Sequence, residues 1–205
     1  MTQPETRLFI VRHGAALGSQ GIAVGQVDLP ISEAGAASIE RLRASWQGPP
    51  PDRLLSSDLA RSKSTAEILN QSWNLDLEID PRLREMDFGT WDGRPWNELR
   101  DTDRDRLDAW KDDWVGTAAP GGESFRDVEH RVNAWFDDLW PSLEGQTAVA
   151  VAHGGSIRTL ACRILGLDLD RAFHFYLDHG RVSGVFNGLR GQELRFLNAD
   201  LFPAE

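Results

Sequence analysis

The chain has 205 residues, enough for one substantial hydrophobic core but short for two full domains, so we expect a single domain spanning 1–205. Hydrophobic residues make up 40% of it and eight are tryptophan, which excludes a disordered chain. The formal net charge of −10 argues against nucleic acid as a partner, so an anionic ligand must be held by a local cluster of positive charge.

Cysteine content and the first apolar run bear on the compartment. Cys162 is the only cysteine, which excludes an intrachain disulfide and a thiolate metal framework and fits a reducing compartment. The first apolar run covers only 8–11, too short for a signal peptide or a membrane span. We therefore expect a cytoplasmic protein with no membrane partner. The sequence leaves the oligomeric state open, a homodimer included.

The first predicted element is a buried strand at 8–11, because this run is short, apolar and partly β-branched. It leads directly into Arg12, His13 and Gly14. These polar groups are thus expected at the carboxyl end of a strand. Ser32 is a suitable N-cap for the helix that follows.

Two more strands are predicted at 54–57 and 75–79, with a helix between them. Arg61 falls near the start of that helix, one turn from its positive end, where it could help to bind an anion. The stretch 81–122 then breaks the alternation, since it is rich in Asp, Arg and Trp and lacks a long apolar run. We interpret it as a helical cap inserted over the site.

The second half returns to regular elements. Ser124 and Asp127 resemble a capping box before an amphipathic helix. A strand at 147–152 ends at His153, and Ser156 is expected to open the next helix. Runs at 183–190 and 193–197 flank Gly191 and are typical of a strand pair. These elements predict a three-layer α/β/α sandwich with a mostly parallel central sheet.

The two histidine-glycine corners, after 8–11 and 147–152, are expected to face one another. Open α/β sheets bind ligands at the carboxyl ends of their strands, where loops meet helix N-termini. Guanidinium groups match phosphate oxygens, and glycine lets backbone N–H groups approach closely. Arg12 and Gly14 supply both features beside His13.

Four motifs together carry a family resemblance, and they occur in the family's order. The chain resembles the histidine phosphatases, also called phosphoglycerate mutase-like proteins, from residue 8 to about residue 160. The matching segments are 8–14 (LFIVRHG), 57–66 (SDLARSKSTA), 83–93 (LREMDFGTWDG) and 152–155 (AHGG), with Gly25, Asp28, Pro30 and Gly35 also in place.

The resemblance implies a phosphohistidine mechanism. His13 would attack phosphorus, and Glu85 would protonate the departing alcohol and later activate water. A neutral imidazole is a competent nucleophile near neutral pH, which agrees with this role. Arg12, Arg61 and His153 would stabilise the charge on the equatorial oxygens. The implied substrate-binding set is Arg12, Gly14, Arg61, His153 and Gly154, with a small phosphorylated substrate and no metal or cofactor.

Three alternatives stay open. Two histidines with Glu85 and Asp87 could form a metal centre, although Arg12 and Arg61 would repel a divalent cation. A phosphoglycerate mutase would use the same motifs to move phosphate between phosphoglycerates. A phospho-ligand binding module without activity is disfavoured, because the histidines, the arginines and Glu85 are all retained.

The loop after Gly14 departs from the family pattern. Ala15 and Ala16 stand where a polar pair, often ending in Thr or Ser, is usual, so a hydroxyl contact to phosphate is missing. The family's asparagine a few residues later is also absent. We therefore assign no ligand contacts in the loop from residue 15 to residue 25.

Substrate choice is expected to depend on the cap. Segments 86–96 and 120–124 are similar to the α-ribazole phosphatase branch of cobalamin assembly. Flat aromatic rings there could stack a benzimidazole-like base or could form the cap's own small core. The tryptophans concerned are Trp91, Trp96, Trp110 and Trp114.

The remaining histidines and the cysteine lie outside the matched motifs. We expect structural or surface roles for His130, His174 and His179, and a buried, inert thiol at Cys162.

Overall fold

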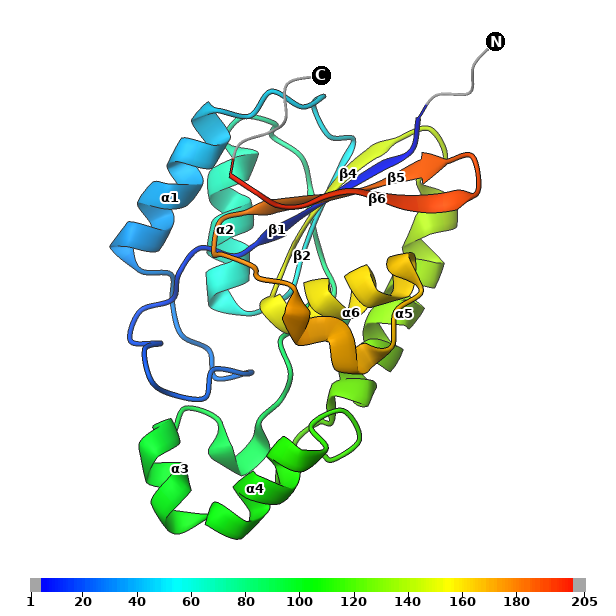
Figure 1. Ribbon diagram of the computed structural model, residues 1–205. Helices are drawn as coiled ribbons and strands as arrows, with labels where there is room; N and C mark the ends of the chain where they lie inside the picture. The colour runs from blue at the N-terminus through cyan, green and yellow to red at the C-terminus, as the bar shows by residue number, and fades with distance from the viewer. Residues whose placement is uncertain (1–4, 201–205) are drawn as a thin grey trace.

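The computed structural model describes residues 5–200. Their strands form one six-stranded sheet in the order β3-β2-β4-β1-β5-β6. The four strands β3, β2, β4 and β1 are parallel, whereas β5 pairs antiparallel with β1 and β6 with β5 (Figure 1). The mostly parallel sheet is thus confirmed. The strands are β1 (Arg7–Arg12), β2 (Arg53–Ser56), β3 (Leu77–Ile79), β4 (Thr147–Ala152), β5 (Val182–Gly188) and β6 (Gly191–Ala199).

Helices cover both faces of the sheet. Successive side chains of a strand point to opposite faces, so Leu8 and Ile10 belong to one buried core and Phe9 and Val11 to the other. The three-layer α/β/α sandwich is confirmed. Helices α1 (Glu33–Ala44) and α2 (Ala60–Asn70) pack on the Phe9 side, and α5 (Phe125–Ser142) and α6 (Gly154–Leu165) on the Leu8 side.

The predicted helix caps form. The Ser32 hydroxyl accepts the N–H of Gly35 at 3.0 Å, and Ser124 and Asp127 make a reciprocal capping box. Two boundaries were predicted wrongly by two residues: β3 begins at Leu77 and not at residue 75, and α6 begins at Gly154, with His153 as its N-cap, and not at Ser156. The earlier start places the N–H groups of the two glycines in the first turn of α6.

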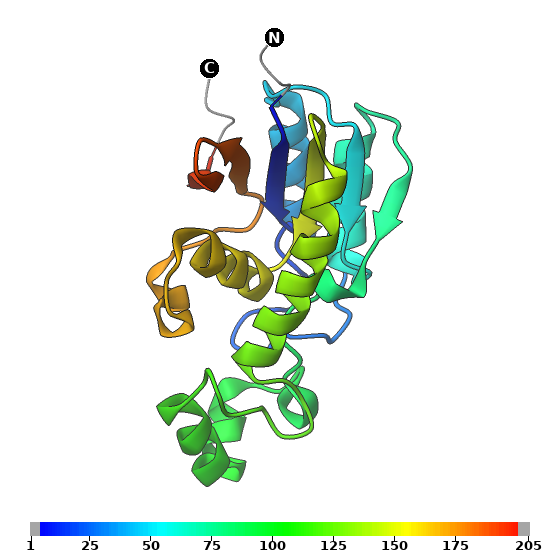
Figure 2. The same cartoon turned by 90° about the vertical axis from the view of Figure 1, so that its right-hand side faces the viewer.

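The segment predicted as a cap lies beyond the carboxyl ends of the parallel strands and is set apart from the sheet in both views (Figures 1 and 2). Trp91 is fully buried within it, and its indole N–H donates to Asp103 Oδ2 at 2.6 Å. The segment contains η1 (Pro81–Leu83), η2 (Gly89–Trp91), α3 (Trp96–Thr102) and α4 (Arg104–Asp112), and η3 (Leu169–His174) follows α6.

One edge of the sheet gathers the segments that carry the predicted functional residues. Strands β1, β2, β3 and β4 all end there, and because β5 is antiparallel to β1, the residues just before β5 lie at the same edge. Among residues 5–200, no helix has the length and apolar character needed to cross a membrane.

Candidate active site

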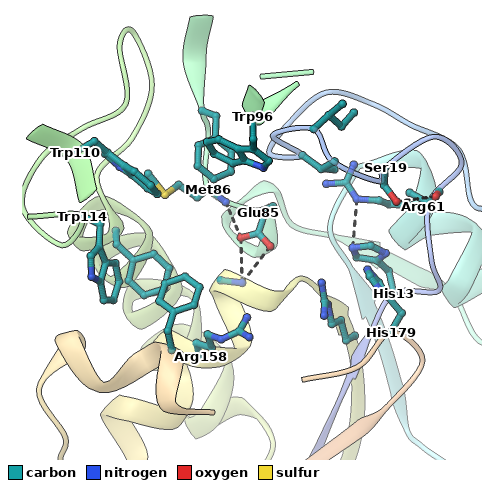
Figure 3. Close-up of a pocket in the computed structure, with 18 residues that line it drawn as sticks. His13, Ser19, Arg61, Glu85, Met86, Trp96, Trp110, Trp114, Arg158 and His179 are labelled. Atoms are coloured by element: carbon teal, nitrogen blue, oxygen red, sulfur yellow. Dashed lines mark hydrogen bonds between the residues drawn. The ribbon is translucent and has the colours of Figure 1, made fainter. Parts of the chain in front are cut away.

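A cavity of about 300 Å³ opens at this edge of the sheet (Figure 3). Polar and cationic groups gather at one end of it and aromatic side chains at the other. It is lined by Arg12, His13, Ala16, Ser19, Ile22, Val24, Arg61, Glu85, Met86, Phe88, Trp96, Trp110, Trp114, Phe125, Gly155, Arg158, Phe173 and His179.

His13 follows β1 and is 4% exposed. Its Nδ1 lies 2.7 Å from the carbonyl oxygen of Gly14. Because a carbonyl oxygen only accepts, the ring proton must lie on Nδ1, which leaves a lone pair on Nε2. Arg61 donates its Nε–H to that nitrogen at 3.3 Å. The ring is therefore fixed in the tautomer in which Nε2 can act as a nucleophile.

The surroundings of His13 keep it neutral. Burial, and then the positive charge of Arg61, hold its pKa well below the usual histidine value of 6.5. A neutral ring keeps the Nε2 lone pair available at neutral pH.

His153 lies behind His13 and not on the cavity wall. Register pairs Arg12 with Ala152 across β1 and β4, so the next residues, His13 and His153, are neighbours with ring centroids 4.7 Å apart. His153 is fully buried, and its Nε2 shares a 2.8 Å hydrogen bond with the hydroxyl of Ser57. Its Nδ1 has no hydrogen-bond partner within residues 5–200.

Arg61, on the first turn of α2, is fully buried, and backbone carbonyls fix its orientation. Its Nη1 and Nη2 donate to Val27 and Gly25 at 2.9 and 2.6 Å. The loop that bears these carbonyls is held in turn by Asp92, whose carboxylate accepts the N–H groups of residues 25–27 at 2.6–2.8 Å. Arg61 is thus pre-positioned beside His13.

Arg12 and Arg158 bring two more guanidiniums to the cavity. Arg12 Nη1 donates to the carbonyl of Leu177 at 2.6 Å, while its buried Nε finds no acceptor among residues 5–200. Arg158 lies over the ring of Phe173, 4.9 Å from its centroid. Burial lowers the pKa of both guanidiniums, but an arginine stays charged at neutral pH. The cavity therefore has a strongly positive end in a chain of net negative charge.

Among residues 5–200, Glu85 supplies the only carboxylate of the cavity wall. Gly155, in the first turn of α6, donates its N–H to Oε1 and Oε2 at 3.0 and 3.1 Å, and Met86 donates to Oε1 at 2.9 Å. Figure 3 shows Glu85 facing the cavity across from His13. The helix N-terminus thus holds the carboxylate in a defined position.

Arg131 of α5 braces the backbone that carries Glu85. Its Nη1 donates to the carbonyls of Arg82 and Arg84, both at 2.7 Å, and its Nη2 to the carbonyl of Glu85 at 2.9 Å. It also forms a 2.8 Å ion pair with Glu123. The segment that carries Glu85 is therefore tied to a long core helix.

The two glycines predicted to bind substrate lie near the cavity but do not line it. The N–H of Gly14 donates to Thr65 Oγ1 at 3.0 Å, so this donor is already engaged. A side chain on Gly14 would come within 2.9 Å of the carbonyl oxygen of Gly35, which explains why glycine is needed there. Gly154 packs against Arg12 and Arg158. Its ligand role stays a prediction.

The aromatic end of the cavity separates the two interpretations of the tryptophans. Trp91 belongs to the core of the segment, whereas Trp96, Trp110 and Trp114 line the cavity. Trp96 and Trp110 stack at 6.4 Å, and Trp114 meets Phe173 edge to face at 4.8 Å. The core interpretation therefore holds for Trp91, whereas stacking of a base by the tryptophans that line the cavity stays a prediction.

Three residues of the site were missed by the sequence reasoning. His179 was expected to have a structural or surface role, and it is indeed exposed, but its ring also lines the cavity, 5.1 Å from that of His13. Arg158 stands four residues after Gly154, and this one-turn spacing from the histidine-glycine corner was a usable signal. Ser57 was quoted within a motif but given no partner. His130 and His174 are exposed as expected, and Cys162 is buried, with its pKa raised to about 11 by burial.

The metal-centre alternative can be tested by geometry. Within residues 5–200, no three His, Cys, Asp or Glu side chains are grouped so that they could hold a metal ion. Asp87, a candidate ligand, instead accepts the N–H of Gly89 at 2.7 Å.

Comparison with known proteins gives consistent matches. The family model for the histidine phosphatase superfamily (branch 1) matches residues 8–200. Adenosylcobalamin/alpha-ribazole phosphatase of Escherichia coli K12 is 29% identical over 97% of this chain and 98% of its own. The alpha-ribazole phosphatase structure from Shigella flexneri superposes with a TM-score of 0.90 at 28% identity, covering 97% of this chain and 99% of that one. A mycobacterial glucosyl-3-phosphoglycerate phosphatase in complex with VO3 gives a TM-score of 0.79 at 30% identity, covering 95% and 99%.

Proposed function

Since the chain belongs to the histidine phosphatase superfamily, branch 1, we propose that it is a metal-independent phosphomonoesterase that forms a phosphohistidine at His13. The observation that carries this proposal is the unprotonated Nε2 of His13 at the cationic end of the cavity, where it accepts the Nε–H of Arg61 at 3.3 Å, a contact that Arg61 would exchange for the phosphate. Arg12 and Arg158 add the positive charge that a phosphate dianion requires.

In the first step, His13 Nε2 attacks phosphorus and the bond from phosphorus to the ester oxygen breaks. Arg12 and Arg61 stabilise the charge on the equatorial oxygens, which is the main catalytic task in phosphoryl transfer. The buried Nε–H of Arg12, which has no acceptor within residues 5–200, would donate to one of these oxygens. His153 supports His13 from behind and acts as a positioning residue.

Glu85 supplies the proton. Its carboxyl group gives a proton to the departing alkoxide, and as a carboxylate it then takes a proton from the water that attacks the phosphohistidine. Breaking the Nε2–phosphorus bond releases inorganic phosphate and restores His13. General acid–base catalysis of this kind contributes about 10²–10⁴-fold in rate.

The aromatic end of the cavity favours an alcohol with a flat ring system. Trp96, Trp110 and Trp114 supply ring faces, and the carboxylate of Glu85 is held between these rings and the cationic end. Relatives that cover nearly the whole chain are named for alpha-ribazole phosphate hydrolysis. We therefore propose α-ribazole 5′-phosphate, whose base is a benzimidazole, as the substrate.

The test is a panel of phosphate esters assayed for released inorganic phosphate with excess chelator present. We expect hydrolysis that survives chelation, with the highest kcat/KM for α-ribazole 5′-phosphate. The panel includes phosphoglycerates with and without a bisphosphorylated primer. Phosphate transfer between phosphoglycerates would replace our proposal by a mutase, and activity lost on chelation would return the metal centre to consideration.

A further inference from the structure

His179 places a third imidazole at the nucleophile. Its ring centroid is 5.1 Å from that of His13, with 55° between the ring planes, and it lines the same cavity. Figure 3 shows His13 between Arg61 on one side and His179 on the other. A phosphorus atom poised for attack stands about 3–3.5 Å from His13 Nε2. The oxygens of that phosphoryl group then come within reach of the His179 ring.

Backbone hydrogen bonds hold the residue after His179 against the segment that carries His13. The N–H of Gly180 donates to the carbonyl of Arg12 at 2.9 Å and approaches that of His13 at 3.3 Å. Two residues later the chain enters β5, where Val182 pairs with Val11 of β1. His179 is therefore held by the same backbone that positions His13, as a ligand-binding side chain should be.

The phosphoryl end of the cavity has room for another donor. Arg61 already donates from Nη1 and Nη2 to the carbonyls of Val27 and Gly25, and Arg12 donates from Nη1 to the carbonyl of Leu177. Residues 15 and 16 are both alanine and provide no side-chain donor, although Ala16 lines the cavity. The ring of His179 makes no hydrogen bond to any of residues 5–200. Ser19 of the same loop also lines the cavity, but its hydroxyl donates to the carbonyl of Ala16 at 2.9 Å. The N–H of the His179 ring is thus uncommitted where the loop has no free donor.

We propose that His179 donates a hydrogen bond to the phosphoryl group held at His13, in place of the hydroxyl that residues 15 and 16 lack. This inference rests on the proposed phosphatase function and adds a phosphate-binding residue to it. The charges that face the ring are Arg12 of β1, Arg61 of α2 and the adjacent Asp178. His179 is an exposed residue, but partial desolvation of its ring at the cavity and the two guanidiniums lower its pKa to about 4, so the ring is neutral in the free enzyme and one nitrogen carries the donated proton.

The experiment measures inhibition by orthovanadate and inorganic phosphate, which occupy only the phosphoryl end. We expect His179→Ala to weaken both inhibitors about tenfold, the loss typical of one hydrogen bond to a charged group. His179→Gln keeps an N–H donor and should restore inhibition to within about threefold of wild type. His174→Ala is the matched control, because His174 is an exposed histidine of the preceding η3 that lies off the cavity. Circular dichroism verifies that each variant is folded.

The outcomes separate this inference from the function on which it rests. If His179→Ala is inhibited as strongly as wild type, His179 does not contact the phosphoryl group, whereas the phosphatase assignment stands. If the glutamine variant behaves like the alanine variant, the ring serves only to pack against His13 and the donor role is refuted. If wild type itself is inhibited by neither anion, the phosphatase function fails and this inference fails with it.

Discussion

Replacing Gly155 with alanine should misplace the proton donor without unfolding the protein. A Cβ at this position would lie 2.2 Å from Glu85 Oε1, whereas ordinary contacts are 3.4–4 Å long. The nearest obstacle is the end of a flexible side chain and not backbone, so the carboxylate should move and the fold should stay. The required shift is about 1 Å, a misplacement that costs about 10²-fold in rate.

The assay compares kcat for an alkyl phosphate and an aryl phosphate. The alkyl ester should slow about 100-fold and the aryl ester less, because a good leaving group needs the proton less. The melting temperature should change little. Gly154→Ala is the matched control on the same helix, since its Cβ would meet Arg158 Nη1 at 2.8 Å and not Glu85. It should show no dependence on the leaving group.

A double-mutant cycle tests whether the effect passes through Glu85. In a Glu85→Gln background, Gly155→Ala should add little, because residues that act as one unit are not additive. A further 100-fold loss in that background, or equal slowing of alkyl and aryl esters, would refute the reasoning.

Three further predictions concern the nucleophile, pH and the aromatic wall. His13→Ala should abolish turnover while circular dichroism still shows a folded chain, and radiolabelled substrate should no longer label the protein. The buried His13 and His153 have pKa values below those in the unfolded chain, so the unfolded state gains protons first as pH falls below about 6.5 and stability is lost there. Unfolding free energy should drop by about 3 kcal/mol between pH 7.5 and 5.5, about 1.4 kcal/mol for each of the two histidines, and His13→Gln should flatten the slope; an equal slope in both would contradict this. Trp114→Ala should raise KM about tenfold for an ester with a flat aromatic alcohol and leave vanadate inhibition unchanged.

The sheet and its functional edge follow from local sequence signals. The runs at 8–11 and 147–152 are apolar, short and end in histidine-glycine, so the parallel pair β1–β4 and the approach of His13 to His153 were predictable. Arg61 was also predictable, because its place near a helix N-terminus is set by a few neighbouring residues.

His179 escaped prediction for a topological reason. The expectation placed ligands at the carboxyl ends of parallel strands, but His179 precedes a strand. It reaches the site because β5 runs antiparallel to β1, and this reversal depends on long-range pairing that no local pattern encodes. The sequence also could not show which tryptophans are buried in the segment and which line the cavity. Trp91 and Trp114 are distinguished by their tertiary neighbours, which no local pattern reveals.

The contacts of Arg131 fix Glu85 to α5, so the position of this carboxylate does not depend on the α3–α4 segment. Glu85, the proposed proton donor, is braced by Arg131 of α5, whereas the rings proposed to contact the alcohol come largely from the segment of α3 and α4. That segment can diverge, taking up new side chains to admit other alcohols, while the distance from acid to nucleophile stays as it is. Substitutions in the α3–α4 segment can therefore change which substrate is accepted while the catalytic geometry is kept.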